Sequence, residues 1–313
     1  MILLLQYMII FASVLSLVAL GGCFSEHSGV INLGLEGIMV VGAMGGAMIM
    51  NLVPATLPAP VMILIVCVAS IIFGMLYSCL LGLACINLNA DQTLIGTAMN
   101  MLSTAVAVIV VRSYNTSRNS SDVSSILKYV DAKKKFLIRF GSFEFNWFMI
   151  IALAAVIISY IVLYKTKFGL RLRACGENPQ AADSVGINVY RMRWAGVTIS
   201  GLLGGLGGIT YIMAGVSEWK FENGVAGFGF LSLAVMIFGQ WKPHRIGLAA
   251  LLFGFFRSLS NVYSGIPFLK AMNIPSAVYN MMPYIISLIV LAFTSSNSAA
   301  PKAEGIPYDK GTR

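Results

Sequence analysis

The sequence has very little charge. Only 11% of its 313 residues are Asp, Glu, Lys or Arg, and 58% are apolar. The mean hydropathy is +0.84. A soluble globular domain carries about 25% charged residues. This chain has too few polar side chains to cover a water-soluble surface, so the composition indicates a protein embedded in a membrane.

Basic residues are missing from the first third of the chain. Residues 1–111 contain no Lys or Arg, and all 21 basic residues lie between Arg112 and Arg313. The net charge is +9, which in a soluble protein would suggest a nucleic-acid partner. In a membrane protein the same excess is explained by basic loops beside anionic lipid headgroups. We therefore predict membrane lipids, and no nucleic acid, as partners.

The sequence also lacks the residue patterns of enzymes and metal sites. H-E-x-x-H and G-x-S-x-G are absent, His27 and His244 lie in different loops, and the five cysteines have no metal-ligand spacing. We expect no catalytic residue, no metal and no cofactor. The motif G-x-x-x-x-G-K-[ST] is absent too, so the chain has no phosphate-binding loop of its own. LGGC at 20–23 is similar to a lipoprotein cleavage site, but no basic region precedes it.

Nine apolar segments approach the length of about 20 residues that a helix needs to cross a bilayer. They are approximately 2–20, 37–52, 60–86, 92–111, 147–164, 194–215, 225–241, 246–262 and 276–295. The segment 37–52 is short and follows the polar stretch EHSGVINLGLE, so it is either a clean span or a broken or re-entrant helix. We predict an all-α polytopic membrane protein with eight or nine transmembrane helices in one domain, residues 1–295.

Polar loops and the tail decide the orientation. Residues 112–146 and 165–193 are both basic, and they lie on opposite sides of the membrane because one helix, 147–164, separates them. The positive-inside rule is therefore divided. Helix counting places the basic turn KPHR at 242–245 and the tail, 296–313, on the same side as 165–193. We predict that this side is cytoplasmic and that 112–146 is an external loop.

The loop 165–193 contains the signals of a short helix. Asn178 suits the N-cap and Pro179 suits the first helical position, where a missing N–H costs nothing. Ala181 and Ala182 favour helix, and Gly186 suits its end. We predict about two helical turns here. By itself the pattern is equally that of an ordinary amphipathic connector.

Four blocks along the chain resemble a known family. They read FSEHSGVINLGLEGIMVVGA, GENPQAADSVGI followed by SGLLGGLGG, GFGFLSLAVMIFGQWKPHRIGLAALLFG, and MMPYIISLIVL. Together they resemble the permeases of ABC importers for branched-chain amino acids, ribose and nucleosides, and the first block is most similar to the nucleoside branch. The resemblance spans about residues 10–295. Residues 112–146 and the tail are not part of it.

The resemblance implies a division of labour between subunits. Two permeases would form the path through a bacterial plasma membrane, two ATPase subunits would bind their cytoplasmic face, and an external binding (lipo)protein would deliver the solute. Asn178, Pro179, Ala181, Ala182 and Gly186 would then form the coupling helix, with its small residues seated in a groove of the ATPase. A nucleoside is the expected solute. A sugar or branched-chain amino acid, or a secondary transporter with its own energy source, are the alternatives.

Polar residues inside apolar segments are candidates for the solute path. Glu36 is the most costly of them, and we expect Asn32, about one helical turn earlier, on its face. Asn100 lies centrally in its own segment. The alternative for Glu36 is that it caps a broken helix by accepting hydrogen bonds from free backbone N–H groups.

Three further polar residues are weaker candidates: Gln240, Arg257 and Asn280. For Arg257 we favour an extended side chain that reaches the outer headgroups. The glycines of GGLGGI at 204–209 are expected to allow close helix packing.

Overall fold

A computed structural model describes residues 2–54, 56–127, 136–140, 143–215, 219–265, 275–294 and 299–310. Every predicted apolar segment contains a helix. Among these described residues, six helices are long and apolar enough to cross a membrane, so the predicted all-α, multi-pass membrane fold is confirmed. These six are α1 Ile2–His27, α2 Leu35–Leu52, α3 Ala59–Gly82 (continued by a π-turn, Leu83–Asn87), α4 Gln92–Arg118, α6 Trp147–Lys165 and α9 Val189–Gly215.

The remaining apolar segments form α10 Phe228–Phe238, α11 Pro243–Val262 and α13 Ser276–Thr294. With 11 residues, α10 is about 16 Å long and reaches roughly half-way across a hydrocarbon core of about 30 Å. The short helix is therefore α10, whereas we expected the break at 37–52. There α2 is continuous over 18 residues, and the non-helical stretch is the mostly buried connection 28–34 before it.

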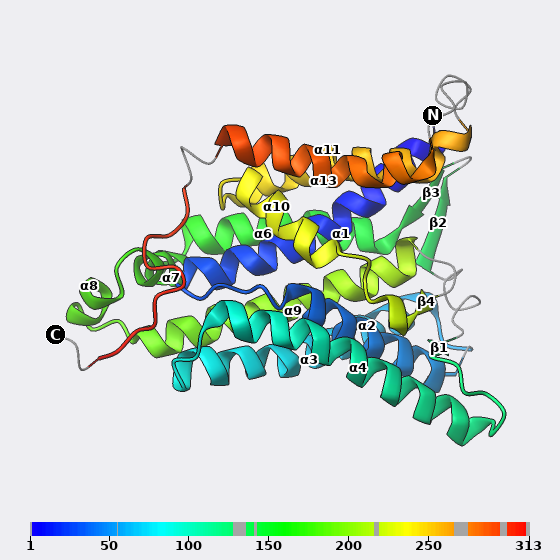
Figure 1. Ribbon diagram of the computed structural model, residues 1–313, viewed down its shortest axis with the longest axis horizontal. Helices are drawn as coiled ribbons and strands as arrows, with labels where there is room; N and C mark the ends of the chain where they lie inside the picture. The colour runs from blue at the N-terminus through cyan, green and yellow to red at the C-terminus, as the bar shows by residue number, and fades with distance from the viewer. Residues whose placement is uncertain are drawn as a thin grey trace.

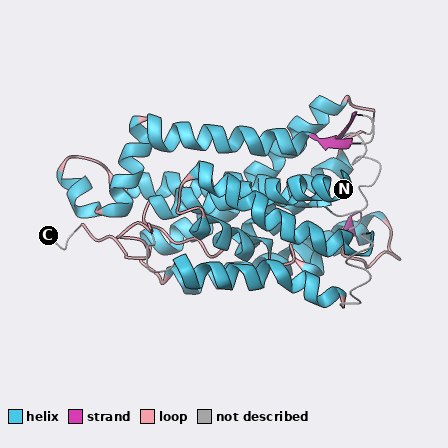
Figure 2. Ribbon diagram, turned by 90° about the horizontal axis from the view of Figure 1, so that it is seen from above, coloured by secondary structure: helices cyan, strands magenta, loops and turns pink. Residues whose placement is uncertain are grey.

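The helices run side by side, with the two chain ends at opposite ends of the bundle (Figure 1). Viewed from above, the bundle is equally elongated and its loops gather at the two ends (Figure 2). Helix α1 is central: it packs on α9, α10 and α11, and it is buried throughout from Ile10 to His27.

Glycines let α9 approach its neighbours closely, as the sequence predicts. A Cβ on Gly208 would lie 2.0 Å from the carbonyl oxygen of Met39 on α2. One on Gly205 would lie 2.3 Å from the carbonyl oxygen of Ser70 on α3. Since any side chain would separate these backbones, the glycine run 204–208 sets the distance between α9, α2 and α3.

Two kinds of structure close the ends of the bundle. At one end lie α7 Lys167–Glu177 and α8 Pro179–Ser184. At the other lie two short antiparallel pairs, β1 Ile126–Leu127 with β4 Trp219–Lys220, and β2 Leu137–Phe140 with β3 Phe143–Asn146 (Figure 1). The start of the predicted loop 112–146 is helical, because α4 continues to Arg118.

Local signals explain where several helices begin. Asp91 caps α4 by accepting from the N–H of Leu94 at 2.8 Å, and Asn146 caps α6 by accepting from the N–H of Phe148 at 3.1 Å. Helix α10 begins differently. Its N-cap is Gly227, in the left-handed region at φ +78°, with no capping side chain of its own. The free N–H groups at its start therefore need partners from elsewhere in the fold.

Candidate functional site

The first turns of α2 and α10 meet around the carboxylate of Glu36. Its Oε1 accepts from the N–H of Gly227 at 2.9 Å, and its Oε2 accepts from the N–H of Gly229 at 2.7 Å. Glu36 lies in the first turn of α2, so its charge also faces the positive end of that helix. Glu36 thus caps a half-length helix, as the capping alternative proposes. The capped helix is α10, which is distant in sequence.

The backbone at the start of α10 is shaped for this contact. A Cβ on Gly229 would lie 2.5 Å from both Cα and N of Glu36, so only glycine allows the approach. Ala226 and Gly227 both have positive φ. The hydroxyl of Tyr284 on α13 donates to the carbonyl of Ala226 at 3.2 Å. Two distant helices, α2 and α13, therefore hold this turn.

Asn100 on α4 closes the break before α2. Its Nδ2 donates to the carbonyl of Leu33 at 2.8 Å, and its Oδ1 accepts from the N–H of Gly37 at 2.8 Å. One amide thereby satisfies a carbonyl of the non-helical connection and an N–H of the first helical turn. Asn100 and Glu36 are both partly exposed.

Asn32 does not lie where we expected it. It belongs to the non-helical connection 28–34 and not to a helical turn beside Glu36. Its side chain is fully buried. Its Nδ2 donates to Ser200 Oγ on α9 at 2.8 Å, and its Oδ1 accepts from the N–H of Gly34 at 3.1 Å. Asn32 therefore anchors the connection to α9 and presents no polar atom to a solute.

The other candidates divide between the site and the end of the bundle. The guanidinium of Arg257 lies over the ring of Phe228 on α10, 5.4 Å from its centre, and also over Phe11. It therefore points toward the start of α10, whereas we favoured a side chain that reaches the outer headgroups. Gln240 lies beyond α10, where its Oε1 accepts from the N–H of Ala299 at 3.1 Å. The side chain of Asn280 lies outside the described residues.

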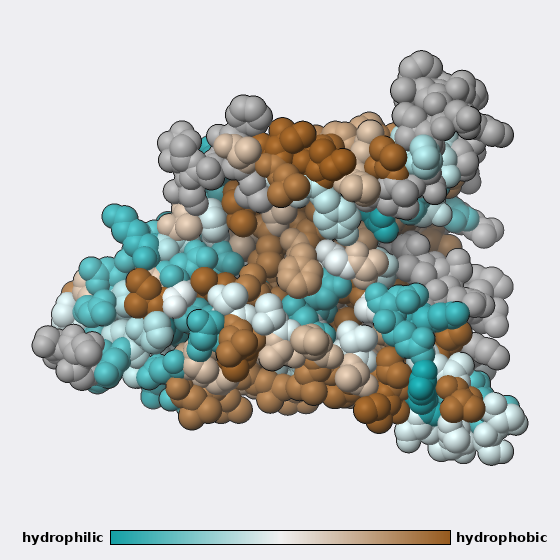
Figure 3. Space-filling view, in the orientation of Figure 1, coloured by the Kyte–Doolittle hydropathy of each residue, from teal (hydrophilic) through white to brown (hydrophobic). Residues whose placement is uncertain are grey.

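Sequence reasoning missed Thr104 and Tyr284. The Oγ1 of Thr104 and the Oε1 of Glu36 both lie 3.9 Å from the position a Cβ would take on Gly224. Thr104 follows Asn100 by one helical turn, so the spacing could have indicated it. Tyr284 carries no local signal, because its relation to α10 depends on how α13 packs. Polar patches lie between the apolar surfaces of α13 and of α3 and α4 on this face (Figure 3).

A salt bridge outside the bundle holds the loop that leads into α10. The guanidinium of Arg112, near the end of α4, donates to the carboxylate of Glu222. This hydrogen bond lowers the pKa of the Glu222 carboxyl, so the carboxylate stays ionised. The loop 221–227 is therefore tied to α4 at one end and to Glu36 at the other.

The short helix predicted in the loop 165–193 is present as α8. Asn178 is its N-cap and accepts from the N–H of Ala181 at 3.0 Å, Pro179 takes the first helical position, and Gly186 follows at φ +83°. Ala182 differs from the prediction, which seated it in a groove of the ATPase. It is 3% exposed and packs against the chain itself, so it is not available to a partner's groove. We call α8 and the turn that follows it, residues 179–188, the α8 hairpin. Its exposed residues are Gln180, Ala181, Ser184, Val185, Gly186 and Asn188.

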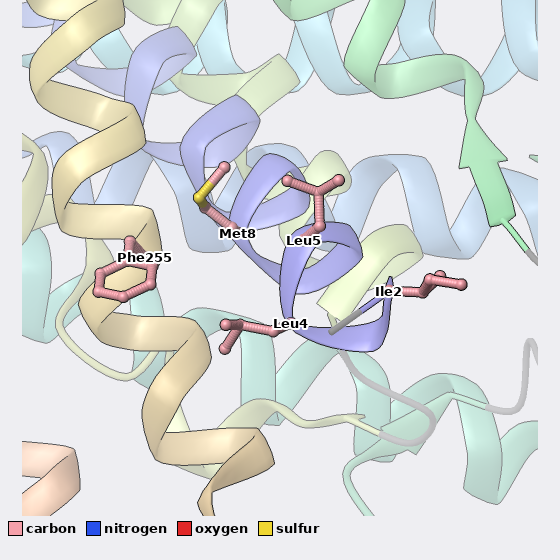
Figure 4. A pocket seen from close by; sticks show the side chains of 5 residues that line it. All are labelled: Ile2, Leu4, Leu5, Met8 and Phe255. Atoms are coloured by element: carbon pink, nitrogen blue, oxygen red, sulfur yellow. The ribbon is translucent and has the colours of Figure 1, made fainter. Parts of the chain in front are cut away.

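An apolar groove between α1 and α11 is a poor solute site. It is lined by Ile2, Leu4, Leu5, Met8 and Phe255 (Figure 4). These side chains offer no hydrogen-bonding group, and Ile2 and Leu5 are about half exposed. The groove is suited to lipid hydrocarbon, whereas a polar solute needs the donors and acceptors around Glu36.

Comparison with known proteins defines the class. Residues 4–292 match the family described as "Branched-chain amino acid transport system / permease component". The chain belongs to this family, the membrane-embedded permeases of ABC transport systems. It is 39% identical over 307 residues to the nucleoside ABC transporter permease protein NupC of Lactococcus lactis, covering 97% of this chain and 95% of that one.

Two further relatives bear on the solute. The guanosine ABC transporter permease protein NupQ of Bacillus subtilis is 39% identical over 311 residues, covering 97% of this chain and 96% of that one. The putative glucose ABC transporter permease protein TsgC13 of Haloferax volcanii is 27% identical over 298 residues, covering 90% and 88%. The family resemblance seen in the sequence is therefore confirmed.

Proposed function

We propose that this chain is a permease subunit of an ATP-driven importer for nucleosides in a bacterial plasma membrane. The observation that carries this proposal is the end-to-end similarity, at 39% identity, to permeases named for nucleoside and guanosine transport. The more distant glucose relative makes a sugar the second candidate solute.

The polar cluster around Glu36 is the proposed point of contact with the solute. A nucleoside presents ribose hydroxyls and the donors and acceptors of its base. Glu36 and Asn100 are partly exposed, and Thr104 lies beside them. Carboxylate, amide and hydroxyl groups at the start of a half-helix can bind such a solute in passing, as half-helices do in other transporters. Asn32 is left out of the contact because it is fully buried.

ATP hydrolysis is assigned to separate subunits, because the chain carries no phosphate-binding loop. The ATPase would bind the α8 hairpin on the cytoplasmic side, so that residues 165–193 are cytoplasmic and 112–146 are external. A second homologous permease would complete the path, and an external binding protein would deliver the solute.

Uptake in a deletion strain tests the solute. We expect loss of radiolabelled nucleoside uptake, with leucine and glucose uptake unchanged, and recovery when the gene is restored. Lost leucine or glucose uptake with nucleoside uptake intact would replace the proposed solute. The complex reconstituted in vesicles should transport only when ATP is supplied on the side of the membrane that bears the ATPase subunits. Transport driven by an ion gradient alone would identify a secondary carrier.

A further inference from the structure

Residues 299–310 form a segment that returns across the α7–α8 end of the bundle, and we call it the strap (Figure 1). Backbone hydrogen bonds fix it at two points. The N–H of Ala303 donates to the carbonyl of Gly176 at 2.8 Å, and the N–H of Gly305 donates to the carbonyl of Gly29 at 3.3 Å. The strap thus joins the end of α7 to the end of α1.

The strap also packs against the buried face of α8. Tyr308 is 3% exposed and forms a small apolar cluster with Cys175, Ala182 and Val189. Its ring packs against that of Tyr190 with centres 5.4 Å apart, and the Tyr190 hydroxyl donates to its carbonyl at 3.3 Å. The buried face of α8 therefore rests partly on the tail, so that α8 and the strap form one unit.

A buried arginine depends on the same segment. Arg193 on α9 is 1% exposed. Its Nη2 donates to the carbonyl of Ile306 at 2.9 Å, and its guanidinium lies over the ring of Tyr308, 5.9 Å from its centre. Burying a charge is costly unless it is hydrogen-bonded. Removal of the strap would leave the Arg193 guanidinium without this hydrogen bond. The hydrogen bond therefore helps to fix the position of the strap.

The outer side of this unit carries exposed apolar side chains. Val185 in the hairpin is 75% exposed and Ile306 in the strap is 54% exposed. Both belong to the end of the molecule that is mostly hydrophilic (Figure 3). Residues 171–191 and 299–310 carry four exposed basic residues, Arg171, Arg191, Lys302 and Lys310, against two exposed acidic ones, Glu177 and Asp309. Exposed apolar residues on segments that also carry exposed charges, outside any membrane helix, are typical of a protein contact.

We propose that the strap and the α8 hairpin together form the surface that binds the ATPase subunit. The inference rests on the proposed function and extends it, because it adds the C-terminal tail to the contact. The partner's surface would pair an apolar groove, for Val185 and Ile306, with acidic residues for the exposed cations of the same segments. Since α8 packs against Tyr308, a displacement of α8 would be transmitted through the strap to α1 and α9.

Matched valine and isoleucine variants test the contact in the full complex. We expect Ile306→Glu and Val185→Glu each to lower the ATPase recovered per permease about tenfold or more, because each buries an unpaired charge at the contact. Val123→Glu is the control. Val123 is 66% exposed at the opposite end of the molecule, and its variant should retain normal ATPase recovery and solute uptake.

A second pair of variants tests the support under α8. Tyr308→Ala should lower ATPase recovery severalfold with normal permease levels in the membrane, and Tyr308→Phe, which keeps the ring, should not. If Ile306→Glu and Tyr308→Ala retain the ATPase while Val185→Glu loses it, the strap inference is wrong and the proposed function stands. If all three retain ATPase and uptake, the docking role of α8 in the proposed function fails as well.

Discussion

At the scale of single residues, Glu36 shows how a carboxylate is accommodated inside a membrane protein. An ionised carboxylate at bilayer depth is costly unless donors surround it. Here the donors are the N–H groups of Gly227 and Gly229 at 2.9 and 2.7 Å. Such donors are abundant at a helix start, because the first N–H groups have no partner within the helix. The cost of the carboxylate and the cost of the half-helix therefore offset each other.

Substitution of Glu36 should affect stability and transport together. Glu36→Gln keeps the size but removes the charge and one of the two acceptor oxygens, so we expect a loss of about 1.5–3 kcal/mol of stability. The melting temperature of the detergent-solubilised complex and nucleoside uptake should both fall. Glu177→Gln, at an exposed position on α7, is the control for melting. Wild-type melting and uptake in Glu36→Gln would contradict both the capping role and the solute contact.

At the scale of elements, the close crossing of α2 and α10 determines where the polar cluster lies. The backbones meet where a Cβ on Gly229 would lie 2.5 Å from Glu36 Cα. Both helices begin here, so their positive ends face the same small volume. That volume also contains Thr104 and the partly exposed Asn100. The two breaks in the helices thus create one site.

A single methyl group should separate these two helices. We expect Gly229→Ala to abolish uptake and to lower the melting temperature by several degrees, because the added Cβ overlaps the α2 backbone. Gly247→Ala on α11 is the matched control. Its Cβ would meet nothing closer than 3.5 Å, and alanine favours helix by up to about 1 kcal/mol over glycine. If Gly229→Ala transports normally, the crossing is looser than the structure indicates.

The strap should respond to pH through Glu304. Burial raises the pKa of its carboxyl to about 7, and within the described residues its Oε2 has no hydrogen-bonding partner. The docked strap therefore holds a proton that the released strap loses. Docking is strongest below the ordinary pKa of a glutamate, about 4.3, and weakens as pH rises to about 7. The charged or titratable groups of the neighbouring helices in this region are Glu26, His27, Arg173 and Arg193.

Trypsin cleavage after Lys302 measures release of the strap. At pH 8 we expect severalfold faster cleavage of the wild type than of Glu304→Gln, which stays neutral. The ratio should fall as the pH is lowered and approach one only below about pH 4.3, where Glu304 is protonated in both states of the strap. Because both proteins meet the same protease at each pH, the ratio removes the enzyme's own pH dependence. Equal cleavage at every pH would show that Glu304 does not control docking.

At the scale of the whole molecule, the two ends are chemically different. The end with α7, α8 and the strap carries more exposed basic than acidic residues, and the other end bears two short β-pairs. The chain begins at the β end and finishes at the α8 end (Figure 1). The proposed function places the first end in the cytoplasm and the second outside.

Thiol labelling checks this orientation. A membrane-impermeant maleimide should label Val123→Cys in intact cells and Ser184→Cys only in inside-out vesicles, since both positions are exposed and lie at opposite ends. Of the native cysteines, Cys23, Cys67, Cys85 and Cys175 are buried and Cys79 is partly buried, so a cysteine-free background completes the design. The reverse labelling pattern would place α8 outside and would remove the ATPase as its partner.

Local patterns in the sequence were sufficient for much of this description. Composition established the membrane class, and apolar length located every long helix. Asn178, Pro179 and Gly186 placed α8 correctly, because a helix cap is formed by atoms within about four residues. The absence of a phosphate-binding loop likewise needed no structure.

Only the tertiary structure decided how these pieces combine. The extent of α10 depends on Glu36, which caps it from 191 positions earlier in the chain. The burial of Ala182 depends on Tyr308, and the environment of Arg257 depends on Phe228. In each case the partner is brought near by helix packing, which no spacing within a few residues encodes. The sequence by itself therefore determined where the long apolar helices lie and which class of protein they form, and packing decided which polar groups meet.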